Sequence, residues 1–263
     1  MKVSIITVCL NAASTISDAI ESVIAQTHPD IEHIIIDGGS TDGTLDVISR
    51  YKDEIHCVVS EPDNGIYDAM NKGISIASGE VIGILNSDDI YEDDKVIEDV
   101  VEKFASTKAD IVLGDVVWVD RENLSCIRRY YSSERFEAWK LRIGWMPPHP
   151  ATFIKSKAYK QAGPYSLEYQ IASDYEMFVR LMLVHHFQFV RLPRVLVRMR
   201  MGGISTSGIR SLWIMNMEII KACKRNNVYT NIFFILTKVP FKLLELYKKP
   251  KGVGSRRKAS PLE

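Results

Sequence analysis

Cysteine is scarce in this chain, and an excess of charge of one sign is missing altogether. The four cysteines among 263 residues lie far apart, and no two of them form a C-x-x-C pair. This spacing predicts neither a disulfide framework nor a zinc site, so we expect reduced core thiols in a cytosolic protein. The 33 basic residues balance the 33 acidic ones, which argues against a uniformly basic nucleic-acid-binding protein. The cysteines are Cys9, Cys57, Cys126 and Cys223.

The sequence also lacks long hydrophobic runs and several common catalytic motifs. No stretch approaches the roughly 18 to 20 apolar residues of a spanning helix, and the N-terminal apolar run is too short for a signal peptide. There is no G-x-x-x-x-G-K-[ST] loop, no G-x-G-x-x-G after the first expected strand and no G-x-S-x-G. These absences argue against a P-loop NTPase and a standard dinucleotide-dependent enzyme, and they exclude a nucleophile elbow. We therefore expect the chemistry to come from carboxylates.

Short β-branched segments alternate with helical patterns through the first half of the chain. With 46% hydrophobic residues, the composition is that of a folded protein, and the alternation predicts βαβ units. We expect an α/β fold with a Rossmann-like, mostly parallel sheet flanked by helices, the first helix capped by Thr15 and Asp18. The expected strands are 3–9, 31–37, 55–60, 81–85, 110–119, 188–190 and 195–199, and the expected helices 15–28, 45–51, 67–77, 93–104, 132–142 and 172–185.

Each expected strand of the first half ends in a polar loop. In an open parallel sheet such loops gather at the carboxyl ends of the strands, where ligands bind. Turns are rich in Gly, Asn and Asp for conformational reasons alone, but four such loops in succession favour a binding site. The loops are Asn11, 37–43, 61–65 and 86–89.

Two adjacent carboxylates, Asp88 and Asp89, follow the apolar strand 81–85. Acids this close repel each other unless a cation or hydrogen-bond donors lie between them. Mg²⁺ and Mn²⁺ bind one or two carboxylates and complete their coordination with water and substrate phosphates. The pair is therefore a candidate site for a metal-bound diphosphate. The alternative is a solvated acidic turn that leads into the helix 93–104.

Four segments together resemble the family 2 glycosyltransferases in their order and spacing. Their joint occurrence is specific, although any one of them alone would be a weak signal. The resemblance covers about residues 1–205 and is greatest to bacterial enzymes that assemble O-antigen, capsule or exopolysaccharide repeat units. It implies a GT-A fold, a nucleotide-sugar donor, a divalent metal (Mn²⁺ or Mg²⁺) and inversion at the anomeric carbon. The segments are Val3–Asn11, Ile36–Thr44, Gly65–Gly73 and Leu85–Asp89.

The resemblance also implies roles for individual residues on the donor side. Thr7 and Asn11 would line the nucleotide cleft, and Asp37 would accept a hydrogen bond from the base, usually uracil. Asp68 and Lys72 would belong to the donor site. Because they lie four residues apart on one helix, they also fit a simple i,i+4 pair worth a few tenths of a kcal/mol.

The same resemblance assigns the metal. Asp88 would contact the ribose or the metal, and Asp89 would hold the metal against the diphosphate. Many family members have a further metal-binding histidine after a late strand, and this chain has none in the segment 198–205. Arg198 or Arg200 would neutralise diphosphate charge in its place, or the Gly202-Gly203 pair would act as a lid.

Inverting glycosyl transfer needs one carboxylate that takes the proton of the acceptor hydroxyl. The segment 172–176 resembles the catalytic acid motif of the family, and Asp174 matches its base, with Glu176 as the second candidate. The alternative is that Asp174 only complements a helix N-terminus. His149 matches a family segment on the acceptor side of the cleft, although a lone histidine in a proline-rich loop is more often structural.

Charge is distributed unevenly along the chain. Residues 221–263 carry a net charge of +9, and residues 1–220 carry −9. The segment 232–249 reads as an amphipathic helix kinked at Pro240, which suggests an in-plane anchor on an anionic membrane. The alternative is a terminal helix packed on the catalytic domain or in a homodimer, followed by a solvated tail. We divide the chain into a catalytic domain, 1–220, and a basic amphipathic helical extension, 221–263.

These features predict an inverting, metal-dependent glycosyltransferase that moves a hexose from a UDP-sugar to a lipid-linked saccharide. The polyprenyl-diphosphate link of the acceptor rests on the resemblance. We expect a cytoplasmic protein, peripheral on the inner face of the cytoplasmic membrane. A nucleotidyltransferase also uses paired acids and Mg²⁺, but strand 3–9 is not followed by a Gly-rich basic loop. A non-catalytic membrane-associated nucleotide-sugar-binding module is disfavoured by the intact acids Asp89 and Asp174.

Overall fold

A mixed β-sheet forms the centre of the computed structural model, which describes residues 1–202 and 208–237. Its strands are ordered β3-β2-β1-β4-β8-β6-β9-β5, and β7 pairs with β6 beside this path. Six strands run in one direction, whereas β5, β7 and β8 run against them, which confirms the predicted α/β class. The strands are β1 (Val3–Cys9), β2 (Ile31–Asp37), β3 (Cys57–Ser60), β4 (Val81–Asn86), β5 (Asp89–Tyr91), β6 (Ile111–Val119), β7 (Ile127–Tyr131), β8 (Thr152–Lys155) and β9 (Phe189–Arg200).

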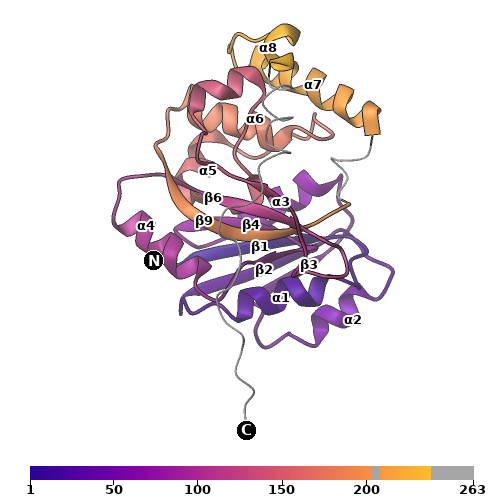
Figure 1. Ribbon diagram of the computed structural model, residues 1–263. Coiled ribbons are helices and arrows are strands. Elements are labelled where there is room, and N and C mark those ends of the chain that lie inside the picture. Colours follow the sequence, from indigo (N-terminus) through magenta and orange to yellow (C-terminus); the bar gives the residue numbers. More distant parts are fainter. Residues whose placement is uncertain (203–207, 238–263) are drawn as a thin grey trace.

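Helices cover both faces of the sheet (Figure 1). α1, α2 and α4 pack on one face, and α3, α5 and α6 pack on the other, where α7 and α8 add a further layer. The helices are α1 (Ile16–Ile24), α2 (Thr44–Ser49), α3 (Ile66–Ile76), α4 (Val96–Ala105), α5 (Ser156–Ala162), α6 (Ser173–Val179), α7 (Gly208–Arg225) and α8 (Ile232–Leu236).

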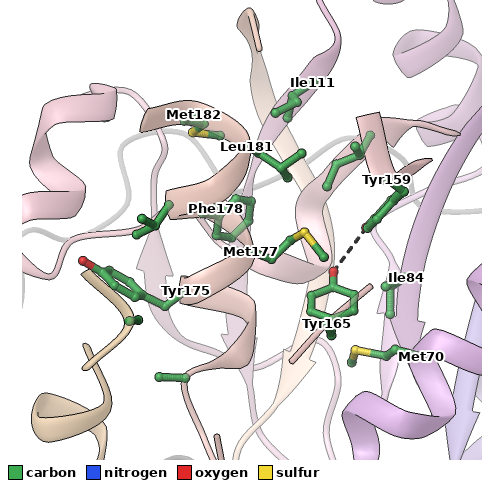
Figure 2. Close-up of a cluster of buried hydrophobic side chains, with 14 of the residues drawn as sticks. Met70, Ile84, Ile111, Tyr159, Tyr165, Tyr175, Met177, Phe178, Leu181 and Met182 are labelled. Atoms are coloured by element: carbon green, nitrogen blue, oxygen red, sulfur yellow. Dashed lines mark hydrogen bonds between the residues drawn. The ribbon is translucent and has the colours of Figure 1, made fainter. Parts of the chain in front are cut away.

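The central strands are buried on both faces, as expected of parallel strands between two helical layers. All seven residues of β1 are buried; Ile5 packs towards α1 and α4, and Ile6 packs towards α3 and α6. Figure 2 shows the cluster that contains Ile6, in which Met177 and Phe178 of α6 pack among buried side chains that include Tyr165. Because α6 is embedded in this cluster, a side chain in its first turn has a fixed position.

Several local predictions are wrong. The segment 132–142 forms only a short 3₁₀ helix at 138–143, because Ser132 and Ser133 bind the buried carboxylate of Asp115 instead of continuing a helix. Thr15 precedes α1 but makes no side-chain cap; its hydroxyl donates to the Ala12 carbonyl. The predicted helix 172–185, in contrast, is present, as α6 followed directly by a π-helical turn at 180–184.

Other differences concern the strands. The short strands β5, β7 and β8 were not predicted. The segments 188–190 and 195–199 are one strand, β9, which passes through Pro193 where its pairing with β6 is irregular. Irregular pairing of this kind is where a sheet tolerates proline. All four cysteines are free, as predicted, but only Cys9 and Cys223 are buried in the core.

The C-terminal part of the chain is described only as far as Thr237. Within the described residues, no helix is long and apolar enough to cross a membrane. α7 runs through residue 220 without a break, and the division of the chain at this point stays a prediction. Of the predicted amphipathic segment only Ile232–Leu236 is described as a helix; Pro240, the lysines beyond it and Gly203 lie outside the described residues.

Candidate active site

The four polar loops predicted from the sequence meet at one edge of the sheet. The register pairs Cys9 with Asp37, Asp37 with Ser60, and Val8 with Asn86. The last residues of β1, β2, β3 and β4 therefore lie side by side at the carboxyl edge. This is the place where an open parallel sheet binds ligands.

The buried carboxylate of Asp37 accepts several hydrogen bonds at this edge. Its carboxylate accepts backbone hydrogen bonds from Gly39 and Ser40, at 3.1 and 3.0 Å, and the hydroxyl of Ser60 donates to it at 2.7 Å. Burial alone would raise the pKa of Asp37, but the hydrogen bonds from Ser40, Ser60 and Gly39 outweigh it and lower the pKa. Asp37 has no exposed surface. Its predicted contact with a nucleobase stays a prediction, and the contacts that the structure shows are with the turn 38–40 and with Ser60.

Thr7 is buried in the same way. Its hydroxyl lies 3.0 Å from His33 Nε2, and burial lowers the pKa of His33 to about 4. Asn11, in contrast, is exposed at the edge in a left-handed conformation, with φ of 51°. Its side-chain oxygen accepts the Thr41 amide at 2.9 Å. Of these two predicted donor-site residues, Asn11 is the one that presents a surface to a ligand.

A further carboxylate, Asp63, lies against Gly38 at this edge. A Cβ atom built on Gly38 would lie 2.4 Å from Asp63 Oδ2, so a larger residue at position 38 would displace the Asp63 side chain. Asp63 Oδ1 accepts the Gly65 amide at 2.8 Å. The signal in the sequence was the Gly38-Gly39 pair, which leaves room above the end of β2.

Asp68 and Lys72 on α3 do not pair with each other. Asp68 accepts the Asn64 amide at 2.9 Å, and Lys72 Nζ contacts Glu61 at 2.8 Å and the Pro62 carbonyl at 3.0 Å. Both side chains thus hold the loop between β3 and α3. This arrangement excludes the simple i,i+4 pair and leaves both residues beside the nucleotide edge, where their donor-site role stays a prediction.

The two adjacent acids lie after β4 and differ in exposure. Asp89 begins β5, is 2% exposed and accepts the side-chain amide of Asn86 at 3.0 Å. Burial raises the pKa of Asp89 well above its ordinary value, and the neighbouring charge of Asp88 adds to the rise. Asp88 is half-buried, and its backbone carbonyl accepts a hydrogen bond from Arg200 at 2.9 Å. Asp88 is therefore the more accessible of the two carboxylates.

The two arginines near the end of β9, Arg198 and Arg200, make different contacts. Arg198 forms a two-bond ion pair with Glu92, at 2.7 and 2.8 Å, so it is committed away from the edge. Arg200 is 7% exposed, contacts the acidic loop at Asp88 and forms an ion pair with Asp18 in the first turn of α1. Of the two, Arg200 is the cation that lies beside the predicted diphosphate site.

The oxygen atoms around Asp88 fit a hard divalent cation. Asn86 Oδ1 is buried without a hydrogen-bond partner, and the adjacent acids raise each other's affinity for a positive charge. In residues 1–202 and 208–237, no group of three His, Cys, Asp or Glu side chains is placed to hold a metal. Mg²⁺ and Mn²⁺ commonly take only one or two carboxylates and fill their shells with water and phosphate oxygens. The residues present therefore suit a metal that is held partly by the substrate.

Asp174 lies in the first turn of α6, where it contacts Tyr67 at the start of α3. The hydroxyl of Tyr67, in the first turn of α3, donates to the Ile171 carbonyl and lies 3.4 Å from Asp174 Oδ1. The Tyr175 amide donates to the same oxygen at 2.7 Å. Both of these contacts are to Oδ1. Burial raises the pKa of Asp174 to about 6 against these hydrogen bonds, a value suited to a general base near neutral pH.

Glu176, the second candidate for the base, is committed elsewhere. Arg180 Nε lies 2.9 Å from both of its oxygens, and Asn226 donates to it at 3.0 Å. Glu176 is also buried. The structure therefore separates the two acids, because Arg180 pairs with Glu176 and not with Asp174.

His149 contacts the same aromatic cluster as Asp174. His149 Nε2 lies 2.8 Å from the Tyr165 hydroxyl, and the Tyr165 ring stacks on Tyr67 with centroids 5.8 Å apart. Burial lowers the pKa of His149 to about 4, so the ring is neutral at physiological pH. His149 thus reaches Asp174 only through two tyrosines. Tyr67 lies within the segment 65–73, which resembles the family, so the sequence pointed to this region. Nothing in the sequence pointed to Tyr165.

The geometry describes an α/β fold with a half-buried carboxylate, Asp174, beside the start of α3, and an acidic loop at one sheet edge. The family model "Glycosyl transferase family 2" matches residues 4–162, and the chain belongs to this family of nucleotide-sugar-dependent glycosyltransferases. An uncharacterized glycosyltransferase of Mycobacterium tuberculosis is 34% identical over 184 residues, 69% of each chain. A "PGL/p-HBAD biosynthesis glycosyltransferase" of Mycobacterium bovis is 29% identical over 181 residues, 67% of this chain and 68% of that one.

Solved structures confirm the GT-A fold. TarS 1–349 of S. aureus in complex with UDP-GlcNAc has a TM-score of 0.64 at 17% identity, covering 84% of this chain and 67% of that one. The chain spans only 40% of a longer TarS structure. The mannosyltransferase PcManGT of Pyrobaculum calidifontis, in complex with GDP-Man and Mn²⁺, has a TM-score of 0.58 at 16% identity, covering 94% of this chain and 81% of that one. At these identities the likeness shows the fold alone.

Proposed function

We propose that the protein is an inverting, metal-dependent hexosyltransferase that uses a UDP-sugar. The observation that carries the proposal is Asp174, a carboxylate in the first turn of α6 beside Tyr67, with a pKa raised by burial to about 6. In a single displacement the acceptor hydroxyl attacks the anomeric carbon, its proton passes to the Asp174 carboxylate, and the bond from that carbon to the diphosphate oxygen breaks. One base and one displacement imply inversion.

The donor would bind along the carboxyl edge of the sheet. Asn11 and Asp63 present polar atoms beside the ends of β1 and β3, where the nucleoside would lie. Asp88 would hold Mn²⁺ or Mg²⁺, which when bound would neutralise the leaving diphosphate. Arg200 places a further positive charge beside the same loop. Structures of the same fold that contain UDP-GlcNAc, or GDP-Man with Mn²⁺, support a nucleotide-sugar donor and a metal.

The acceptor in this proposal is a lipid-linked saccharide, and the reaction belongs to the synthesis of bacterial surface polysaccharide or glycolipid. The name of the Mycobacterium bovis relative supports a role in glycoconjugate synthesis. The polyprenyl-diphosphate form of the acceptor, and O-antigen, capsule or exopolysaccharide as the product, rest on the resemblance in sequence.

A lipid-linked acceptor also implies that the protein works at a membrane. A group of exposed hydrophobic side chains on and beside α8, which we call the α8 surface, could contact it: Tyr229, Phe233, Phe234 and Leu236. Ile235 anchors α8 in the core, whereas Phe233 is 77% and Tyr229 69% exposed. Aromatic side chains of this kind favour the membrane–water interface, and the net charge of +9 from residue 221 onward favours anionic lipid. We propose that this surface contacts the inner face of the cytoplasmic membrane.

The proposed reaction is tested by product analysis. The protein would be incubated with UDP-hexoses or GDP-mannose, a short polyprenyl-diphosphate-linked saccharide, and either Mn²⁺ or EDTA. We expect transfer from a UDP-sugar only with the metal, and proton NMR should show an inverted anomeric configuration. A retained configuration, or full turnover in EDTA, would contradict the proposal. Transfer from GDP-mannose alone would replace the UDP assignment.

A further inference from the structure

One face of α7 contacts the loop that leads into α6. Glu218, Lys221 and Arg225 lie at spacings of three and four residues and therefore share a face of the helix. Lys221 and Arg225 both form ion pairs with Glu168, and Lys221 Nζ also lies 5.0 Å from the Tyr169 ring centroid. α7 thus runs along the segment 168–172, immediately before the proposed base.

Glu218 makes the strongest of these contacts, because its carboxylate accepts three consecutive backbone amides. Glu218 Oε1 lies 2.7 Å from the Gln170 nitrogen, and Oε2 lies 2.9 Å from the nitrogens of Ile171 and Ala172. Charge-assisted bonds from amides to a carboxylate are stronger than neutral ones. The carbonyl of Ile171 accepts a hydrogen bond from the hydroxyl of Tyr67. Two residues beyond this doubly held loop lies Asp174.

We infer that Glu218 is a positioning residue for the base: by binding the amides of residues 170–172, it fixes the loop from which Asp174 is presented. The inference rests on the proposed role of Asp174. The ionisable groups that face Asp174 are Tyr67 on α3, Tyr165 in the loop before α6, and Glu218 on α7. The negative charge of Glu218 raises the pKa of Asp174, although less than burial does. Glu218 therefore affects both the place and the protonation of the base.

Two substitutions of Glu218 separate the effect of its charge from the effect of its side-chain length. Glu218→Gln keeps the length but removes the charge and turns one acceptor into a donor that faces an amide. We expect kcat to fall by about 10- to 100-fold, because a misplacement of about 1 Å has effects of that size. The acid limb of the pH–rate profile should move to lower pH. Glu218→Asp keeps the charge but shortens the reach, so kcat should fall while the limb stays in place. KM for the donor should change little in both variants.

The matched control is Glu168→Gln. Glu168 joins the same loop to the same helix, but through an exposed pair, and such pairs contribute little. We expect its kcat and pH profile to be those of the parent protein. Two results for Glu218→Gln would overturn the inference. The first is a normal kcat, and the second is a loss of kcat with an acid limb that has not moved. If Asp174→Asn also kept its activity, the proposed base itself would be wrong, so the two failures are distinguishable. Thermal unfolding checks that each variant is folded.

Discussion

The ionisation of Asp174 predicts how the rate of transfer depends on pH. Burial raises the pKa of Asp174 from 3.8 to about 6, and a base acts only in its deprotonated form. The rate should therefore be constant above about pH 7 and fall about tenfold between pH 7 and pH 5. An aspartate with an ordinary pKa would still be about 90% ionised at pH 5 and would show almost no fall.

The assay is the initial rate of UDP release at saturating donor and acceptor, between pH 5 and pH 8 at constant ionic strength. Circular dichroism at each pH shows that the protein stays folded. Asp174→Asn should lower the rate by about 10²- to 10⁴-fold and remove the acid limb from any activity that remains. A flat profile down to pH 5, or an unchanged limb in Asp174→Asn, would refute the assignment.

The same pKa shift makes a prediction for stability. Because the folded-state pKa lies above the unfolded value, the contribution of Asp174 to stability is fully present below about pH 3.8 and is lost as the pH rises through about 6. Asp174→Asn removes this ionisation, so it should raise the free energy of unfolding at pH 8, by at most about 3 kcal/mol. The half-buried position of Asp174 reduces this figure through solvent screening. Urea denaturation at pH 8 measures the difference; an inactive but destabilised variant would instead point to disrupted packing.

Three further predictions concern other parts of the molecule. Asp88→Asn should abolish the strengthening of UDP binding by Mn²⁺ in calorimetric titration without changing the unfolding temperature; an unchanged metal effect would exclude Asp88 as a ligand. Glu176→Gln should lower the free energy of unfolding by about 3 kcal/mol, because it disrupts the buried pair with Arg180, while the acid limb stays in place; a lost limb would restore Glu176 as the base. Phe233→Glu should weaken binding to phosphatidylglycerol vesicles and leave turnover of a soluble acceptor unchanged; equal vesicle binding would count against the α8 surface.

The first half of the fold was predictable because its signals are local. Each of the strands β1, β2 and β4 is a short apolar run between polar loops, and the direction of βαβ units places those loops at one edge. The strands β5, β7 and β8, which run against the others, were not predicted. The pairing of β5 and β8 depends on partners far along the chain, such as Met199 for Asp89, whereas β7 pairs with β6 across the local loop 120–126.

The sequence by itself indicated the family, the edge of the sheet and the candidate acids Asp88, Asp89 and Asp174. Only the tertiary structure decided how each of these acids differs from its neighbour. Asp174 is distinguished from Glu176 by Arg180, which pairs with Glu176 alone, and by Tyr67, 107 positions away on α3. Glu218, 46 positions after Ala172, had no local signal. The physical reason is that burial, charge and hydrogen-bond partners set the pKa and availability of a carboxylate, and these come from residues that folding brings together.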